Sequence, residues 1–278
     1  MPTSDTSFID TYRRTQTSTG PSLFTTPLKL KRLFVCSLML NVFILGTGTL
    51  FVAQRGGISY LKEQWRRSSS GIVGETYFKD RRAIFAAMPK RKTPIVFLGD
   101  SLTERCPWNE LLQRNDVIVR GIGGEDIAGV IKSVPEVARH KPKRIFVMAG
   151  TNDIIQNKTE AEVVALYKRL ISSLKHQSPQ SVLVIQSILP MSTKVFSQYS
   201  PTEAQNELRA TNQQIAQINK RIRGMANGKK IIYCDVAGAV KHGGQLDPKF
   251  TSDGIHLNIK GYMKWKKAIT PLLGPTKM

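Results

Sequence analysis

The chain has 278 residues, of which 41% are hydrophobic, and this length and composition accommodate one good-sized folded domain with additional segments. The formal net charge of +21 indicates an anionic partner. Because the basic residues are spread along the whole chain, with no long basic run, zinc-finger spacing or aromatic RNA-binding motif, we exclude nucleic acid and favour an acidic membrane surface.

The first 53 residues predict a tail followed by a membrane segment. Residues 1–32 are rich in Thr, Ser and Pro and are predicted to be a disordered tail. Residues 33–53 contain no charged side chain and are long enough to cross a bilayer as a helix. A buried core helix would carry a polar face, and a cleaved signal peptide would have a shorter apolar region. We therefore predict one uncleaved transmembrane signal anchor.

Residues 54–92 are basic and are predicted to form a juxtamembrane stalk near anionic lipid head groups. Basic residues flank the predicted anchor on both sides, so the positive-inside rule gives no orientation. We expect a single-pass membrane protein whose folded domain, residues 93–278, lies on the extracytoplasmic side.

The folded domain is predicted to alternate strands with helices. Five short apolar runs without polar alternation are typical of strands that are buried on both faces, at 95–98, 117–119, 145–148, 182–185 and 231–233. Three stretches have helical spacing of apolar residues, at 160–176, 203–225 and 259–273, and the first two lie between predicted strands. This order predicts an α/β fold with a five-stranded parallel sheet covered on both faces, in which ligands bind at the carboxyl ends of the strands.

Ser101 directly follows the first predicted strand, in the tripeptide Gly99-Asp100-Ser101. A serine at such a strand-to-helix turn lies at the carboxyl edge of the sheet, close to backbone N–H groups that favour negative charge. Ser101 is therefore a candidate nucleophile. A serine that only caps a helix is a common alternative for this position.

Asp253 and His256 lie just before the last predicted helix. A serine hydroxyl needs a base to become a nucleophile, and the base needs a group that fixes its tautomer. His256 is the candidate base, and Asp253, three residues earlier, is the candidate group that orients it. Of the other three histidines, His242 in a glycine-rich loop is the one serious rival.

Two further loops follow predicted strands and could bind a developing negative charge. The glycines of 121–124 allow the backbone to approach a ligand closely. A dinucleotide-binding loop is disfavoured, because Asp126 occupies the place of the last glycine of that motif. Asn152 follows the third strand and can donate a side-chain N–H to an oxyanion, although an Asn-Asp turn is a serious alternative.

The three cysteines form neither a disulfide framework nor a metal-ligand spacing. We predict free thiols at Cys36, Cys106 and Cys234, while a bridge between Cys106 and Cys234 stays open.

Four ordered blocks between residues 94 and 273 resemble the SGNH or GDSL hydrolase family. They read Phe-Leu-Gly-Asp-Ser-Leu-Thr from Phe97, Gly-Ile-Gly-Gly from Gly121, Gly-Thr-Asn-Asp from Gly150 and Asp-Gly-Ile-His-Leu from Asp253. Within that family the chain looks most similar to the catalytic subunits of platelet-activating-factor acetylhydrolase and their bacterial relatives. One departure is Val119, at a position where the family often has asparagine.

This resemblance implies a three-layer α/β/α sandwich of the flavodoxin-like type and a serine esterase mechanism. Ser101 would attack an ester carbonyl while His256, held by Asp253, takes its proton. The backbone N–H groups of Ser101 and Gly124 and the side chain of Asn152 would form the oxyanion hole. No metal and no organic cofactor is expected. The absence of a Gly-x-Ser-x-Gly elbow around Ser101 argues against the α/β-hydrolase fold.

We therefore expect a membrane-anchored hydrolase of short-chain acyl esters, acetyl above all, with acylated surface glycans and lysophospholipids as candidate substrates. Acyl transfer to an alcohol would use the same residues and stays open. A catalytically silent domain that binds glycan or lipid is the third alternative, which the presence of all five site residues disfavours.

Overall fold

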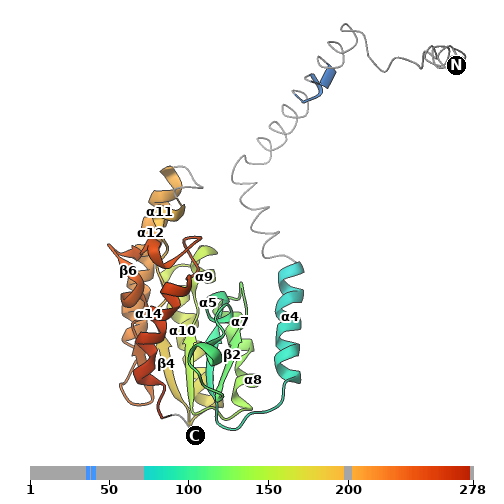
Figure 1. Ribbon diagram of the computed structural model, residues 1–278, viewed down its shortest axis with the longest axis vertical. Coiled ribbons are helices and arrows are strands. Elements are labelled where there is room, and N and C mark those ends of the chain that lie inside the picture. The colour runs from blue at the N-terminus through green and yellow to red at the C-terminus, as the bar shows by residue number, and fades with distance from the viewer. Residues whose placement is uncertain (1–35, 38, 42–71, 197–201, 276–278) are drawn as a thin grey trace, which may run out of the picture. The chain divides into compact units, whose positions relative to one another are not determined.

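The computed structural model describes residues 36, 37, 39–41, 72–196 and 202–275. The chain divides into two compact units, residues 1–68 and residues 69–278 (Figure 1). In the first unit the described residues are helical, and Asn41 Nδ2 donates to the carbonyl of Ser37 at 2.8 Å. Elements below carry the labels of Figure 1.

The predicted tail and nearly all of the predicted anchor at 33–53 lie outside the described residues, so both remain predictions. Within the part of the chain that the structure describes, no helix is both long enough and apolar enough to cross a bilayer.

The second unit is built on a five-stranded sheet in which every strand pair is parallel, as predicted. The strand order is β2-β1-β3-β4-β5. Gly99 at the end of β1 is level with Gly121 of β2 and with Met148 of β3. Three chain segments therefore leave the sheet at one edge. The strands are β1 Ile95–Gly99, β2 Val117–Gly121, β3 Arg144–Met148, β4 Val182–Gln186 and β5 Ile231–Cys234.

Helices cover both faces of this sheet (Figure 1). They are α4 Ile72–Ala87, α5 Ser101–Glu104, α6 Trp108–Leu111, α7 Ile127–Lys132, α8 Val134–Ala138, α9 Thr151–Ile155, α10 Glu160–Gln177, α11 Thr193–Phe196, α12 Thr202–Arg223, α13 Val236–Val240 and α14 Ile259–Ile269. Two short 3₁₀ turns, η1 Pro248–Phe250 and η2 Thr270–Leu272, and a hairpin of β6 Lys241–His242 and β7 Gln245–Leu246 complete the described part. The alternation of strands with helices confirms the α/β class.

The core is divided between the two faces because neighbouring residues of a strand point to opposite sides. Val96 and Leu98 of β1 belong to a cluster with α7, α8, α10 and α12. Ile95 and Phe97 belong to the other cluster, with Trp108 and the residues of α13 and α14. Burial on both faces explains why these strands appear in the sequence as uninterrupted apolar runs.

Helix α4 was not expected as part of the folded domain. We predicted residues 54–92 as a stalk with the domain starting at 93, whereas the compact unit begins at Ser69. Phe85 of α4 is 4% exposed, and Arg139 donates to the Phe85 carbonyl at 2.9 Å. Arg82, in the segment predicted to lie near lipid head groups, forms an ion pair with the buried Glu125. Arg81 and Arg82 of α4 thus make contacts within the domain.

Candidate active site

Ser101 is the first residue of α5, immediately after β1. The residue that caps this helix is Asp100, whose Oδ1 accepts the backbone N–H of Leu102 at 3.0 Å. The alternative interpretation of Ser101 as a capping serine is therefore wrong, because its neighbour makes the capping bond. The Ser101 hydroxyl is free to bond elsewhere.

The Ser101 hydroxyl bonds to His256. Ser101 Oγ and His256 Nε2 are 2.9 Å apart although 155 positions separate the residues. His256 Nδ1 lies 2.7 Å from Asp253 Oδ2, so the imidazole bridges the hydroxyl and the carboxylate. The His256 side chain is 19% exposed and that of Asp253 is 49% exposed, which leaves the pair open to solvent. The structure thus brings together the three residues predicted to act in proton transfer.

The loop that carries His256 is held by hydrogen bonds from its backbone N–H groups to the Asp253 carboxylate. Asp253 Oδ1 accepts the N–H groups of Ile255 at 2.9 Å and of His256 at 2.7 Å. Burial of Asp253 opposes its ionisation, but these N–H bonds and the His256 ring outweigh it and hold its pKa below the usual range. The carboxylate therefore stays ionised wherever the imidazole can work as a base. Asn258 then caps α14 through the N–H of Gly261.

The nucleophile helix and the base-bearing loop also share a buried support. Tyr262 of α14 donates its hydroxyl to the carbonyl of Leu102 in α5 at 2.9 Å. Trp108 contacts Trp265 edge-on, with ring centroids 4.8 Å apart, and Phe97 stacks on Trp108 at 4.6 Å. Because all of these rings are buried, the two elements that carry Ser101 and His256 rest on one aromatic cluster.

The glycine loop after β2 lies next to Ser101. A Cβ atom placed on Gly123 would lie 3.6 Å from the Cβ of Ser101. The Gly123 N–H donates to Glu104 Oε2 at 2.8 Å. Gly124 has a φ of 82°, a conformation that favours glycine. This loop therefore brings backbone groups to the nucleophile as predicted from its position after the strand.

Asn152 contacts the residue after the glycine loop from α9, which starts after the left-handed Gly150. Its Nδ2 atom donates to the carbonyl of Glu125 at 2.8 Å. An amide has two N–H groups, so this bond fixes the side chain and leaves a second donor. The neighbouring Asp153 accepts the N–H of Ile127 at 2.9 Å and an ammonium hydrogen of Lys158. The alternative of an Asn-Asp turn is therefore wrong, because both residues lie in α9 and connect it to the glycine loop and to the start of α7.

Sequence reasoning missed the residues that support this site. Glu104 bonds the glycine loop, yet it lies one residue beyond the block that identified Ser101. Glu125 carries the carbonyl that holds Asn152, and Tyr77 donates its hydroxyl to Glu104 at 2.8 Å. A carboxyl group three residues after the nucleophile was an available signal, because residues i and i+3 share a helix face.

His140, Cys106 and Cys234 are buried, whereas His242 is exposed. His140 is 1% exposed and its Nε2 lies 3.0 Å from Glu136 Oε1. The rival base His242 is exposed in the β6–β7 hairpin. Cys106 and Cys234 are buried free thiols, as predicted, and burial raises both thiol pKa values, that of Cys234 to about 11. Among the described residues, no group of three or more His, Cys, Asp or Glu side chains is arranged to hold a metal ion.

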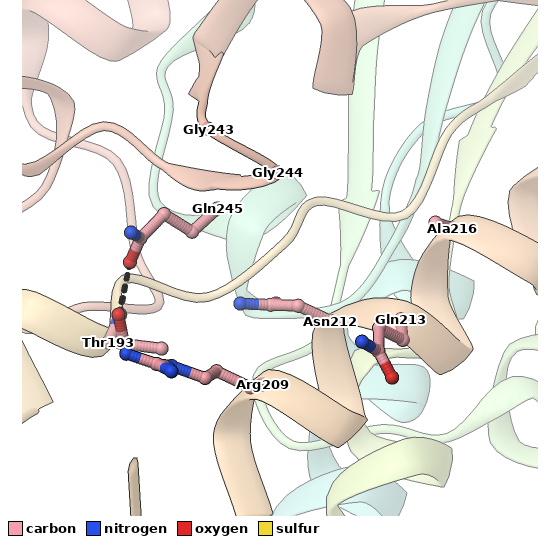
Figure 2. A pocket seen from close by; sticks show the side chains of 8 residues that line it. All are labelled: Thr193, Arg209, Asn212, Gln213, Ala216, Gly243, Gly244 and Gln245. Carbon is pink, nitrogen blue, oxygen red and sulfur yellow. Dashed lines mark hydrogen bonds between the residues drawn. The ribbon is translucent and has the colours of Figure 1, made fainter. Parts of the chain in front are cut away.

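A separate cavity of about 410 Å³ lies between α12 and the β6–β7 hairpin. Figure 2 shows its lining residues, Thr193, Arg209, Asn212, Gln213, Ala216, Gly243, Gly244 and Gln245. None of the predicted site residues lines it. Asn212 holds the Met191 backbone through both amide atoms, and Gln245 Oε1 accepts from Thr193 (Figure 2). The carbonyl of Gly254 accepts the N–H of Ser192 at 2.8 Å, which connects this wall to the loop of Asp253.

Two buried carboxyl groups next to the site predict that stability depends on pH. Burial raises the pKa values of Asp100 and Glu125 to about 7. The folded state therefore binds more protons than the unfolded chain between pH 4 and pH 7. We expect each of these two groups to lower the free energy of unfolding by about 2–3 kcal/mol as the pH rises from 5 to 8.

Urea unfolding at several pH values measures this effect. The matched variant is Asp100→Asn, which keeps the oxygen that caps Leu102 and cannot ionise. Its unfolding free energy should depend less on pH than that of the wild type. The same pH dependence in both proteins would contradict the assignment to Asp100.

The comparison with protein families agrees with this geometry. Residues 97–264 match the GDSL-like lipase/acylhydrolase family. This chain belongs to that family. The GDSL-like domain spans the segment from β1 to α14, and its enzyme class is carboxylic ester hydrolase.

Solved structures show the same fold. A protein from Streptococcus pneumonia whose name refers to platelet activating factor is 24% identical, with a TM-score of 0.61 over 78% of this chain and 98% of its own. A GDSL-like lipase from Bacteroides thetaiotaomicron is 22% identical, with a TM-score of 0.58 over 70% of this chain and 96% of its own. A Bacteroides fragilis protein assigned as an acylhydrolase is 24% identical, with a TM-score of 0.58 over 70% and 94%. Among curated proteins there is no match.

Proposed function

We propose that this GDSL-like protein is a membrane-anchored esterase that uses Ser101 as nucleophile, His256 as general base and Asp253 as the group that orients it. The observation that supports this proposal best is the continuous chain of short contacts, 2.9 Å from Ser101 Oγ to His256 Nε2 and 2.7 Å from His256 Nδ1 to Asp253. Nucleophile and base at such a distance, with the base oriented by a third group, are the signature of covalent serine catalysis.

The reaction proceeds in two halves. His256 Nε2 takes the hydroxyl proton of Ser101 while Oγ bonds to the ester carbonyl carbon, and the carbonyl oxygen becomes an oxyanion. The intermediate then collapses, the bond to the alcohol breaks, and His256 returns the proton to the leaving oxygen. Water, deprotonated by His256, attacks the acyl-enzyme and releases the carboxylic acid and the free serine.

The oxyanion is bound by the N–H groups of Ser101 and Gly124 and by the free amide N–H of Asn152. Ser101 stands at a helix start, where backbone dipoles favour negative charge. Asn152 is already held by the carbonyl of Glu125, so its second donor needs no reorganisation when charge develops. Such fixed donors stabilise a transition state more strongly than water does.

A prediction for Asn152 follows from this role. We expect Asn152→Ala to lower kcat by about 10²- to 10³-fold with little change in KM, because one oxyanion donor is lost. Steady-state kinetics with p-nitrophenyl acetate measure both constants. Asn227→Ala is the matched control, because the exposed Asn227 accepts backbone N–H groups at the start of β5, at the opposite end of the strands from Ser101. A larger loss in the control than in Asn152→Ala would contradict the role.

For substrate, we propose short-chain acyl esters, acetyl above all, with acylated glycans ahead of lysophospholipids. The half-exposed Asp253 and the accessible His256 support this order, since an open site admits the large hydrated alcohol of a glycan. A predicted anchor at 33–53 would hold the site near surface glycans and near lipids alike.

The full chain, purified in detergent, tests activity and substrate class together. We expect turnover of p-nitrophenyl acetate to exceed that of the decanoate, release of acetate from an acetylated glycan, and mass-detected labelling of Ser101 by an organophosphonate. No turnover of any ester and no labelling would contradict the esterase proposal. Preference for the decanoate and for lysophosphatidylcholine would instead identify a lysophospholipid substrate.

The alternative of acyl transfer keeps the same acyl-enzyme and replaces water by an alcohol. The open site also favours this alternative, because a second alcohol can approach the acyl-enzyme. Adding a glycan acceptor should then increase release of p-nitrophenol and yield an acylated glycan. If the acceptor changes neither product, hydrolysis is the reaction.

We further propose that residues 33–53 anchor the protein and that the folded unit lies on the extracytoplasmic side. Alkaline carbonate extraction should leave the chain with the membranes. Protease added to sealed right-side-out vesicles should digest the folded unit. Recovery in the soluble fraction, or protection of the folded unit, would contradict the anchor or the orientation respectively.

A further inference from the structure

Helix α4, which precedes the GDSL-like domain in the sequence, faces the glycine loop with several side chains. Phe78 lies 3.5 Å from where a Cβ atom of Gly124 would be. Tyr77 and Arg81 bind Glu104, and Arg82 binds Glu125. The family match begins at residue 97, ten residues after α4 ends, so these contacts come from outside the matched segment.

The first connection passes through Glu104. The hydroxyl of Tyr77 donates to Glu104 Oε1 at 2.8 Å, and an Arg81 nitrogen lies 3.1 Å from the same oxygen. The other carboxylate oxygen of Glu104 accepts the Gly123 N–H at 2.8 Å. One carboxylate therefore links α4 to the residue that precedes Gly124.

The second connection passes through Glu125. Its side chain is 2% exposed and bonded to Arg82, whose own side chain is 25% exposed. The carbonyl of Glu125 accepts the bond from Asn152 Nδ2. A buried carboxylate that loses its ion-pair partner is strongly destabilised at its position in the fold. The position of Glu125, and with it the orientation of Asn152, therefore depends on Arg82.

Contacts outside these two connections also hold α4. The guanidinium group of Arg120 lies over the Phe85 ring, 4.7 Å from its centre. Arg139 donates to the carbonyls of Phe85 and Met88, at 2.9 and 2.8 Å. Removing a single contact to the glycine loop should therefore leave α4 docked. The two roles, docking and loop support, can be separated by mutation.

We propose that α4 is part of the catalytic apparatus, with Tyr77 and Arg82 as positioning residues that hold the oxyanion-binding loop 121–125 through Glu104 and Glu125. This inference rests on the proposed function, since it assigns α4 to the oxyanion hole of Ser101. Neither side chain touches the reacting atoms. Each acts on a donor that must be in place before charge develops.

The variants Tyr77→Phe and Arg82→Met test the proposal in the full chain. Both keep the apolar part of the side chain and remove the polar contact. We expect kcat for p-nitrophenyl acetate to fall by about 10-fold in Tyr77→Phe and about 10²-fold in Arg82→Met, with KM within about twofold. Arg82→Lys, which restores a cation, should recover most of kcat. Lys79→Ala, on an exposed position of α4, is the control and should behave as the wild type.

A double-mutant cycle separates positioning from general destabilisation. Tyr77→Phe should have little further effect in a Glu104→Gln background, because both changes break one connection. Additive losses, or losses that follow the melting temperature and are not recovered by Arg82→Lys, would overturn the proposal. Unchanged kcat in Tyr77→Phe and Arg82→Met, with Ser101→Ala inactive, would overturn it and leave the esterase function standing.

Hydrogen exchange provides a readout that does not depend on activity. Amides of residues 123–125 should exchange faster in Arg82→Met than in the wild type, while those of β3 should not change. Equal exchange in both proteins would overturn the support of the loop by α4, even if no ester were turned over.

Discussion

Ser101→Ala is expected to lower kcat for p-nitrophenyl acetate by about 10⁴- to 10⁶-fold, because the variant has no atom that can form the acyl-enzyme. The loss should appear in kcat and not in KM, since Ser101 contributes little to ground-state binding. Organophosphonate labelling should disappear as well. The Asp100 cap and the core below β1 are untouched, so the variant should unfold at the temperature of the wild type.

Ser133→Ala is the matched control for this experiment. Ser133 is 3% exposed at the junction of α7 and α8, and its hydroxyl makes no hydrogen bond among the described residues. Its removal should leave kcat and labelling intact. Turnover that survives in Ser101→Ala would contradict the assignment of the nucleophile, whatever the family relationship.

His256→Ala should cost nearly as much as loss of Ser101, since the hydroxyl then has no base. The two changes should not add: the double variant should be no slower than either single one, because nucleophile and base act as a unit. His242→Ala is the control, because His242 is exposed in the β6–β7 hairpin. A loss in His242→Ala that equals the loss in His256→Ala would contradict the choice of base.

Asp253→Asn should cost less than His256→Ala. The amide oxygen can still accept the N–H groups of Ile255 and His256, so the loop keeps its shape. What changes is the partner of His256 Nδ1, which now faces an amide and takes the wrong tautomer. Because Asp253 is 49% exposed, water can replace part of the lost contact, and the effect should be smaller than at a buried carboxylate.

The fold and the proximity of Ser101 to His256 and to the glycine loop could be predicted because they follow from local signals. Strands buried on both faces leave uninterrupted apolar runs, and polar residues that follow such strands must lie at one sheet edge. The four motif blocks then indicated the family.

The support of the site could not be predicted, because it consists of contacts between distant charged residues. Arg82 and Glu125 are 43 positions apart, and in the sequence each looks like a solvated side chain. The capping role of Asp100 was not predicted, because the neighbouring Ser101 was the residue considered as a cap. Among the described side chains of α4, Phe85 is the one that is buried. A single buried apolar residue is too little periodicity to distinguish a packed helix from a stalk in the sequence.

The aromatic cluster below Ser101 and His256 has a consequence for how this enzyme meets its substrate. To move α5 and α6 away from α14, the Tyr262–Leu102 bond and the contact between Trp108 and Trp265 would have to break together. No hinge therefore lies between these helices, and the Ser101–His256 contact is formed without a bound ester. The site is therefore preorganised and does not form by induced fit. Selectivity has to come from the loops around Ser101 and His256, which can vary without disturbing these two residues.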